Sequence, residues 1–115
     1  MTIHKGIYEQ LKEVARNGAL ITYVEIAPLA KLNMESPGDR NRIGEILGEI
    51  STFEHENRRP MLSVLVVHAD DGMPGDGFFN LARELGLLHG SNDEKELAFF
   101  AQQVARVHEY WSGRE

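Results

Sequence analysis

Apolar side chains recur at steps of three and four in three stretches of the chain, which is the spacing of one face of an α-helix. The first stretch spans residues 4 to 17, ahead of Gly18, and the second follows Asp39, whose carboxylate suits a helix N-terminus. The third follows Ser91 and Glu94, which have the spacing of a capping box. The predicted buried faces are Ile7, Leu11, Val14 and Ala15; Ile43, Ile46, Leu47 and Ile50; and Leu97, Phe100, Val104, Val107 and Trp111.

A shorter helix is predicted to begin at about Tyr23. Thr22 and Glu25 have the spacing of a capping box, in which a hydroxyl and a carboxylate each accept a hydrogen bond from a free backbone amide. Because Pro28 has no amide hydrogen, this helix is expected to be short or kinked. It should end before the turn-rich stretch 33–39.

Residues 61–67 form a short, almost wholly apolar run rich in β-branched side chains, which predicts a buried strand. A glycine-rich turn follows at residues 70–77, and a short helix around residues 78–85 is expected to end at Gly86. The pattern predicts an α+β fold that is rich in helix, with one strand or a small hairpin and a long C-terminal helix.

Two glycines interrupt the apolar face of the helix after Asp39. Gly44 and Gly48 are predicted to let that helix approach a neighbour closely. The chain contains no internal repeat, low-complexity tract or linker. We therefore expect residues 1–115 to form a single domain.

Composition narrows the possible chemistry. The 115 residues include no cysteine, which excludes disulfides, thiolate nucleophiles and cysteine-ligated metals. No stretch approaches the roughly 20 consecutive apolar residues that span a bilayer, and the N-terminus lacks a signal peptide's apolar segment, so we expect a cytoplasmic protein without a membrane partner. With 18 acidic and 12 basic side chains the net charge is −6, so nucleic acid would need a local basic patch.

Several short motifs lie in a recognisable order. Ile-Thr-Tyr at 21–23 precedes Ile-Ala at 26–27, Arg-Ile-Gly-Glu-Ile-Leu occupies 42–47, and an apolar run leads to an Asp-Gly turn over 62–72. This order, over residues 19–77, resembles the winged-helix domain of the alkylguanine-DNA alkyltransferase family and its alkyltransferase-like relatives. Those proteins bind DNA through a helix-turn-helix, so the resemblance implies a winged-helix-like fold and DNA binding.

The resemblance also assigns positions. Tyr23 falls on the family's tyrosine, and Asn41, flanked by Arg40 and Arg42, falls on the arginine that fills the gap left by a flipped base. Ser63 stands where the alkyl-accepting cysteine belongs. A serine hydroxyl needs a neighbouring base, and the adjacent side chains are aliphatic, so we reject alkyl transfer and expect no enzyme activity.

The basic residues near the start of the second long helix form the main candidate interface. Arg40, Asn41 and Arg42 are types that meet phosphates or base edges in a major groove. Glu45 and Glu49 follow one and two turns later and would repel phosphates. An ordinary solvated helix start is therefore the alternative.

A second basic pair comes after this helix. Arg58 and Arg59, beside Pro60, would extend the same surface if helix and strand are adjacent. Glu54 and Glu56 lie close by, so a charged loop that keeps the protein soluble is the favoured interpretation.

The glycine-rich segment 72–77 lies between a predicted strand and a helix, where backbone amides can cradle an anion. It has no lysine, serine or threonine, and Asp70, Asp71 and Asp76 oppose an anion, so a structural turn or wing is favoured. His68 with the adjacent aspartates lacks a paired metal-binding motif. We expect no metal and no cofactor.

Three aromatic pairs, Phe78-Phe79, Phe99-Phe100 and Tyr110-Trp111, supply more apolar surface than one face of each helix can bury, so one member of each pair is a candidate for exposure. Exposed aromatics mark a self-association or partner surface, and the alternative in a chain this small is that the rings complete the core. The leading hypothesis is a non-enzymatic nucleic-acid (DNA) binding module. The alternatives are a protein-interaction or regulatory subunit that docks through its C-terminal aromatic helices, and a small-ligand or nucleotide binder at the glycine-rich loop.

Overall fold

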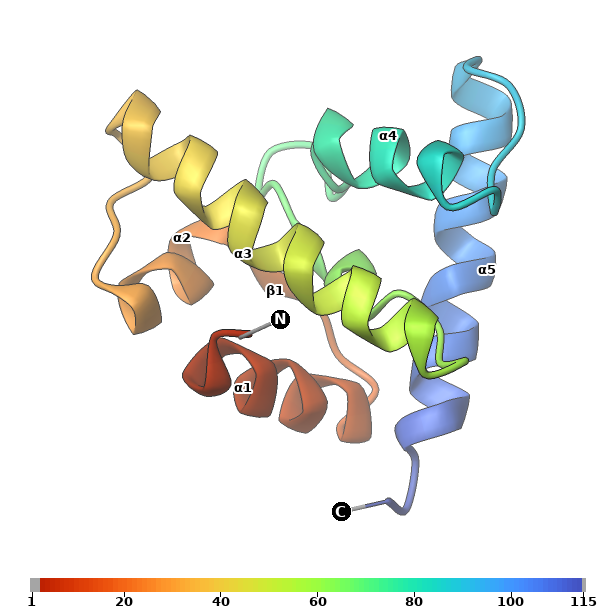
Figure 1. Ribbon diagram of the computed structural model, residues 1–115, viewed down its shortest axis with the longest axis horizontal. Helices are drawn as coiled ribbons and strands as arrows, with labels where there is room; N and C mark the ends of the chain where they lie inside the picture. Colours follow the sequence, from red (N-terminus) through yellow and green to blue (C-terminus); the bar gives the residue numbers. More distant parts are fainter. Residues whose placement is uncertain (1–2, 115) are drawn as a thin grey trace.

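The computed structural model describes residues 3–114 as a helix-rich domain with a two-stranded sheet and a long C-terminal helix (Figure 1). Helix α3 crosses the middle of the molecule, with α1 on one side, α4 on the other and α5 at one end. The elements in chain order are α1 (Lys5–Arg16), β1 (Ile21–Thr22), α2 (Tyr23–Ile26), the 3-10 helix η1 (Ala27–Ala30), α3 (Pro37–Glu56), the 3-10 helix η2 (Leu62–Leu65), β2 (Val66–Val67), α4 (Asp76–Glu84) and α5 (Asp93–Trp111).

The core surrounds the segment 61–67, whose side chains are all buried. Helices α1, α3 and α5 each pack against η2 within this segment. The apolar faces predicted for α1 and α3 are both buried there, so the helical spacing identified two of the three walls of the core.

The strand predicted over residues 61–67 is wrong for most of its length. Residues 62–65 form η2, and only Val66 and Val67 are in a strand. They pair with Ile21 and Thr22 in parallel, so the sheet joins distant segments and is not a hairpin. A continuous apolar run has no periodicity that distinguishes a buried strand from a buried turn of helix, because both faces are covered in either case.

The start of α2 agrees with the predicted capping box. The Thr22 hydroxyl accepts from the Glu25 amide at 3.2 Å, and the Glu25 carboxylate accepts from the Thr22 amide at 3.0 Å. Helix α2 has only four residues, and the chain continues as η1 with Pro28 in its first turn. A proline in the first turn of a helix breaks no helical hydrogen bond, so the chain can continue as η1 where α2 ends.

Two predicted caps are displaced. Ser36, not Asp39, caps α3, while the Asp39 carboxylate accepts from the Asn33 amide at 2.9 Å and so fixes the preceding turn. Asn92, not Ser91, caps α5. Neighbouring Ser, Asn and Asp residues are all good caps, so the sequence alone cannot choose between adjacent candidates.

The buried face of α5 is rotated from the prediction. Leu97 is 56% exposed, and Phe100 and Val104 are only partly buried. The buried residues include Gln103, whose side-chain oxygen accepts from the Met61 amide at 3.1 Å. A polar residue was not expected on this face, but it satisfies a backbone group next to η2 that would otherwise be buried without a partner. The face is Phe99, Gln103, Val107 and Trp111.

Candidate functional site

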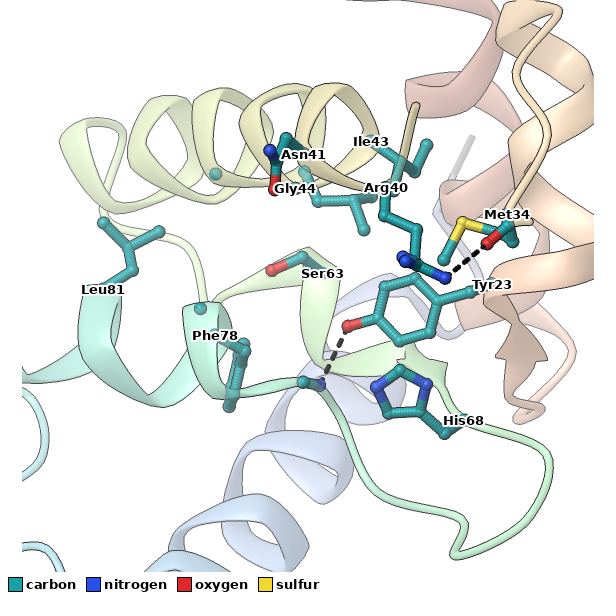
Figure 2. A pocket seen from close by; sticks show the side chains of 14 residues that line it. Tyr23, Met34, Arg40, Asn41, Ile43, Gly44, Ser63, His68, Phe78 and Leu81 are labelled. Atoms are coloured by element: carbon teal, nitrogen blue, oxygen red, sulfur yellow. Dashed lines mark hydrogen bonds between the residues drawn. The ribbon is translucent and has the colours of Figure 1, made fainter. Parts of the chain in front are cut away.

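A pocket of about 300 Å³ lies between α3 and the start of α4, with Tyr23 of α2 on one side (Figure 2). Its apolar lining comes mainly from α3 and α4 and includes Ile43, Leu47 and Phe78. Polar side chains from three other segments also line it. A mostly apolar cavity with a few convergent polar groups is the usual form of a small-ligand site.

Glycines keep this pocket open. A Cβ atom added at Gly44 or at Gly77 would meet nothing within 4 Å, whereas at Gly48 it would lie 3.9 Å from the Leu81 side chain. The prediction that both α3 glycines permit a close approach is therefore wrong for Gly44, and at Gly48 an added Cβ would make only an ordinary van der Waals contact with α4. Gly44 lines the pocket at an exposed position with open space around it.

Tyr23 is fixed by two contacts. Its hydroxyl oxygen accepts from the Gly75 amide at 2.9 Å, and its ring packs on the His68 ring with centroids 4.5 Å apart and planes 31° apart. Burial raises the pKa of Tyr23, and the Gly75 hydrogen bond offsets only part of that effect. Tyr23 is thus neutral near pH 7, and its hydroxyl hydrogen remains available to donate to a ligand.

Arg40 and Asn41 lie at the mouth of the pocket, in the first turns of α3 (Figure 2). The Arg40 guanidinium donates to the Met34 carbonyl at 3.2 Å, which holds it over the opening. Asn41 makes no side-chain hydrogen bond to any of residues 3–114, so both its donor and its acceptor groups are free for a ligand.

Ser63 lines the pocket and is 5% exposed. The hydroxyl of Ser51 accepts from the Ser63 amide at 3.0 Å and lies 2.6 Å from the Ser63 hydroxyl. The two hydroxyls share one hydrogen bond, in which either oxygen can be the donor.

The structure brings together three of the six residues predicted from the sequence. Tyr23, Arg40 and Asn41 line one pocket, while Arg42 points away and lies 3.8 Å from Glu45 and 3.9 Å from Glu49. Glu45 and Glu49, which the sequence predicted to repel phosphates, therefore also partly neutralise Arg42.

Arg58 and Arg59 lie at the other end of α3. This helix has 20 residues, so its ends are about 30 Å apart and the four arginines do not form one continuous edge. Arg59 donates through Nε and Nη2 to the fully buried Glu54 carboxylate, at 2.9 and 2.7 Å. Its role is to neutralise a buried charge.

Sequence reasoning missed the part that the glycines and His68 play in this pocket. Gly75 and Gly77 belong to the glycine-rich segment that was considered separately as an anion site, and His68 was considered only as a metal ligand. No local pattern indicates that β2 and α4 bring them to α3.

Most rings of the three aromatic pairs are buried in the core. Phe78 and Phe79 are both buried and lie edge to face, and Phe99 packs against Phe78. Trp111 is also buried, whereas Phe100 and Tyr110 are only partly covered. Phe100 and Tyr110 thus keep part of their surface accessible, whereas both rings of the pair Phe78-Phe79 complete the core.

Over residues 3–114, no three His, Cys, Asp or Glu side chains are grouped so that they could hold a metal ion. Over the same residues, none of the helices combines the length and apolar character that crossing a bilayer requires. Comparison of the chain with protein-family models, with curated proteins and with solved structures gives no match.

Proposed function

We propose that this protein is a non-enzymatic module that binds DNA and takes one unpaired base into the pocket between α3 and α4, on a winged-helix-like scaffold. The observation that carries the proposal is the convergence of Tyr23, Arg40 and Asn41 on a single pocket of about 300 Å³. These three residues come from α2 and α3, and they are also the positions that the family resemblance assigns to DNA contact.

The chemistry of the pocket suits a nucleobase. A base is flat and apolar on its faces, and the Ile43, Leu47 and Phe78 side chains supply an apolar lining. Its edge carries both donors and acceptors, which match the Asn41 amide and the hydroxyl groups of Tyr23 and Ser63.

Arg40 supplies the charge at the entrance. A base enters a pocket with its phosphate group outside, and a guanidinium at the mouth can pair with that phosphate. Because the base of an intact duplex must first be unstacked, single-stranded or mismatched DNA should bind better than a matched duplex.

The absence of an activated nucleophile supports a binding role. The Ser63 hydroxyl pairs with the Ser51 hydroxyl, and no carboxylate, lysine or histidine among residues 3–114 is hydrogen-bonded to either serine. A serine without a base is not a nucleophile at neutral pH.

Fluorescence anisotropy of labelled single-stranded, mismatched and matched DNA tests the proposal at low and at physiological salt. The pocket-filling variant Gly44→Leu is expected to weaken binding about tenfold or more, because the leucine occupies the space that the base needs. Arg40→Ala should also weaken binding, whereas Arg42→Ala, outside the pocket and beside two glutamates, serves as the matched control.

Wild-type protein that binds none of the three DNAs at low salt would contradict DNA binding, and Gly44→Leu that folds and binds as wild type does would contradict entry of a base into this pocket. Circular dichroism of each variant checks the fold. Leucine is a good helix former and its Cβ meets no atom within 4 Å, so Gly44→Leu should fold.

A free small ligand with the same flat, heterocyclic chemistry is the second candidate. The net charge of −6 favours it, since an acidic protein repels a polyanion but not a neutral nucleoside. Nucleosides that bind as tightly as the oligonucleotide, and lose binding in Gly44→Leu, would favour this candidate over DNA.

A further inference from the structure

A second cleft, of about 310 Å³, lies where the end of α3 meets the C-terminal half of α5. It is far from the first pocket, since the two lie at opposite ends of α3. The loop after α3, α5 and the last described residues all contribute to its lining. The lining residues are Arg58, Pro60, Arg106, Glu109, Tyr110 and Arg114.

The cleft concentrates positive charge in an acidic protein. Three guanidinium groups face one carboxylate, although the whole chain carries a net charge of −6. Among residues 3–114, no carboxylate forms an ion pair with Arg58 or with Arg106. This includes the Glu109 carboxylate, which lines the same cleft. Like charges that line one cleft repel one another, so the cleft attracts an anion.

The backbone of Arg58 is in an unfavourable conformation that places its side chain at the cleft. Its φ is +60°, in the left-handed region that favours glycine or asparagine after a helix. The Arg58 amide donates to the His55 carbonyl at 3.0 Å, and the Arg59 amide donates to the Glu54 carbonyl at 2.9 Å. These two hydrogen bonds end α3 and fix the direction in which the chain leaves it at Arg58.

Arg114 is held in place on the opposite side. Its guanidinium lies over the Tyr110 ring, 4.1 Å from the centroid, and also donates to the Tyr110 carbonyl. The Arg114 carbonyl accepts from Nε of Arg16 at 2.6 Å, which ties this segment to α1. Arg114 is therefore positioned before a ligand arrives, which lowers the entropic cost of binding at this side of the cleft.

We propose that this cleft is an anion site that binds a phosphate group through Arg58 and Arg106, with Arg114 as the third cation. Planar guanidinium groups pair with the oxygens of phosphate through two parallel hydrogen bonds, and several of them around one cleft match a doubly charged anion better than a single carboxylate. The phosphate belongs either to a free small molecule or to a nucleic-acid strand. The proposal does not depend on the base pocket.

NMR titration of ¹⁵N-labelled protein tests the site through the Nε–H resonances of the arginines. Sodium pyrophosphate and a short single-stranded DNA are added separately, each against sodium chloride of equal ionic strength. Saturable shifts of the Arg58 and Arg106 resonances that chloride does not cause are expected. Arg58→Gln with Arg106→Gln should weaken binding about tenfold or more, and Arg42→Gln, at the other end of α3, should leave it unchanged.

The two ligands distinguish the sources of phosphate. Shifts with pyrophosphate support a free ligand, and shifts with DNA alone support a nucleic-acid backbone. Equal shifts with chloride, or pyrophosphate binding that survives in the double variant, would overturn the site. Arg58→Gly relieves the positive φ and keeps the fold, so lost binding in that variant cannot be attributed to unfolding.

Discussion

Glu54, near the end of α3, carries a fully buried carboxylate. One of its carboxylate oxygens accepts from Arg59 and from the Tyr8 hydroxyl, while Oε1 has no hydrogen-bond partner among the described residues. A buried carboxylate that loses its cation is costly, because the charge can neither reach water nor pair.

We therefore expect Arg59→Met to lower the free energy of unfolding by about 3 to 5 kcal/mol. The matched control is Arg58→Met, which removes an exposed, unpaired guanidinium and should change stability by less than about 0.5 kcal/mol. Urea unfolding followed by Trp111 fluorescence measures both. If Glu54→Leu with Arg59→Met is as unstable as Arg59→Met alone, the unpaired charge is not the cause.

Tyr8 gives the same cluster a pH dependence. Burial first, and then the nearby Glu54 carboxylate, raise the pKa of Tyr8 from 10.0 to about 12. An acid whose pKa is higher in the folded state stabilises the fold fully below the unfolded pKa, and that contribution is lost as the pH rises through the folded pKa. Stability should thus fall between pH 10 and 12, and Tyr8→Phe should lose less stability over that range than wild type in urea unfolding.

Arg58 offers a test of backbone strain. Since its φ is +60°, Arg58→Gly is expected to stabilise the protein by about 1 kcal/mol, whereas Arg58→Ala keeps the unfavourable conformation and should give no gain. Thermal unfolding of the two variants separates the effect of φ from the effect of charge, because both lack the guanidinium. A gain of equal size in both would mean that charge repulsion, not backbone strain, is relieved.

Among the elements, the start of α3 matters most for the candidate site, because Arg40 and Asn41 lie just inside it. Ser36→Ala removes the side-chain cap of this helix and should cost about 1 kcal/mol. Ser91→Ala is the matched control and should be nearly neutral, since Asn92 caps α5. Hydrogen exchange should quicken at the Arg40 and Asn41 amides in the first variant only.

The sequence predicted correctly those features that depend only on residues close together in the chain. The apolar faces of α1 and α3 and the Thr22–Glu25 capping box depend on residues within a few positions of one another, and all three agree with the structure. The conformation of residues 61–67 depends instead on what surrounds them, which is why an expected strand is mostly a 3-10 helix. The burial of Gln103 on α5 likewise depends on a residue distant in sequence, because its side chain accepts a hydrogen bond from the Met61 amide.

The candidate site was predicted in part for the same reason. Tyr23, Arg40 and Asn41, which were named from the order of short motifs, line one pocket in the structure, whereas Arg42, Arg58 and Arg59 lie outside it. Arg58 and Arg59 are adjacent in sequence but have different roles, since Arg59 turns inward to Glu54 and Arg58 faces the second cleft. Neighbouring residues in a loop point in different directions, and composition does not reveal which.

For the whole molecule, charge limits how DNA can be held. The net charge is −6, and the two glutamates beside Arg42 leave Arg40 as the main cation at the first pocket. Binding should therefore rest on contacts to one base and not on many phosphates. For single strands, each neutralised phosphate contributes about −0.7 to the slope of log K against log salt.

We expect this slope to be no steeper than about −2 for single-stranded DNA, which corresponds to at most three phosphates. Glu45→Gln with Glu49→Gln should steepen it by about 0.7, because Arg42 is then free to meet one more phosphate. Anisotropy titrations over a range of salt concentrations measure both slopes. A wild-type slope beyond about −4 would require a broad basic surface that the positions of Arg40, Arg42 and Arg58 do not provide, and would move the interface away from the pocket.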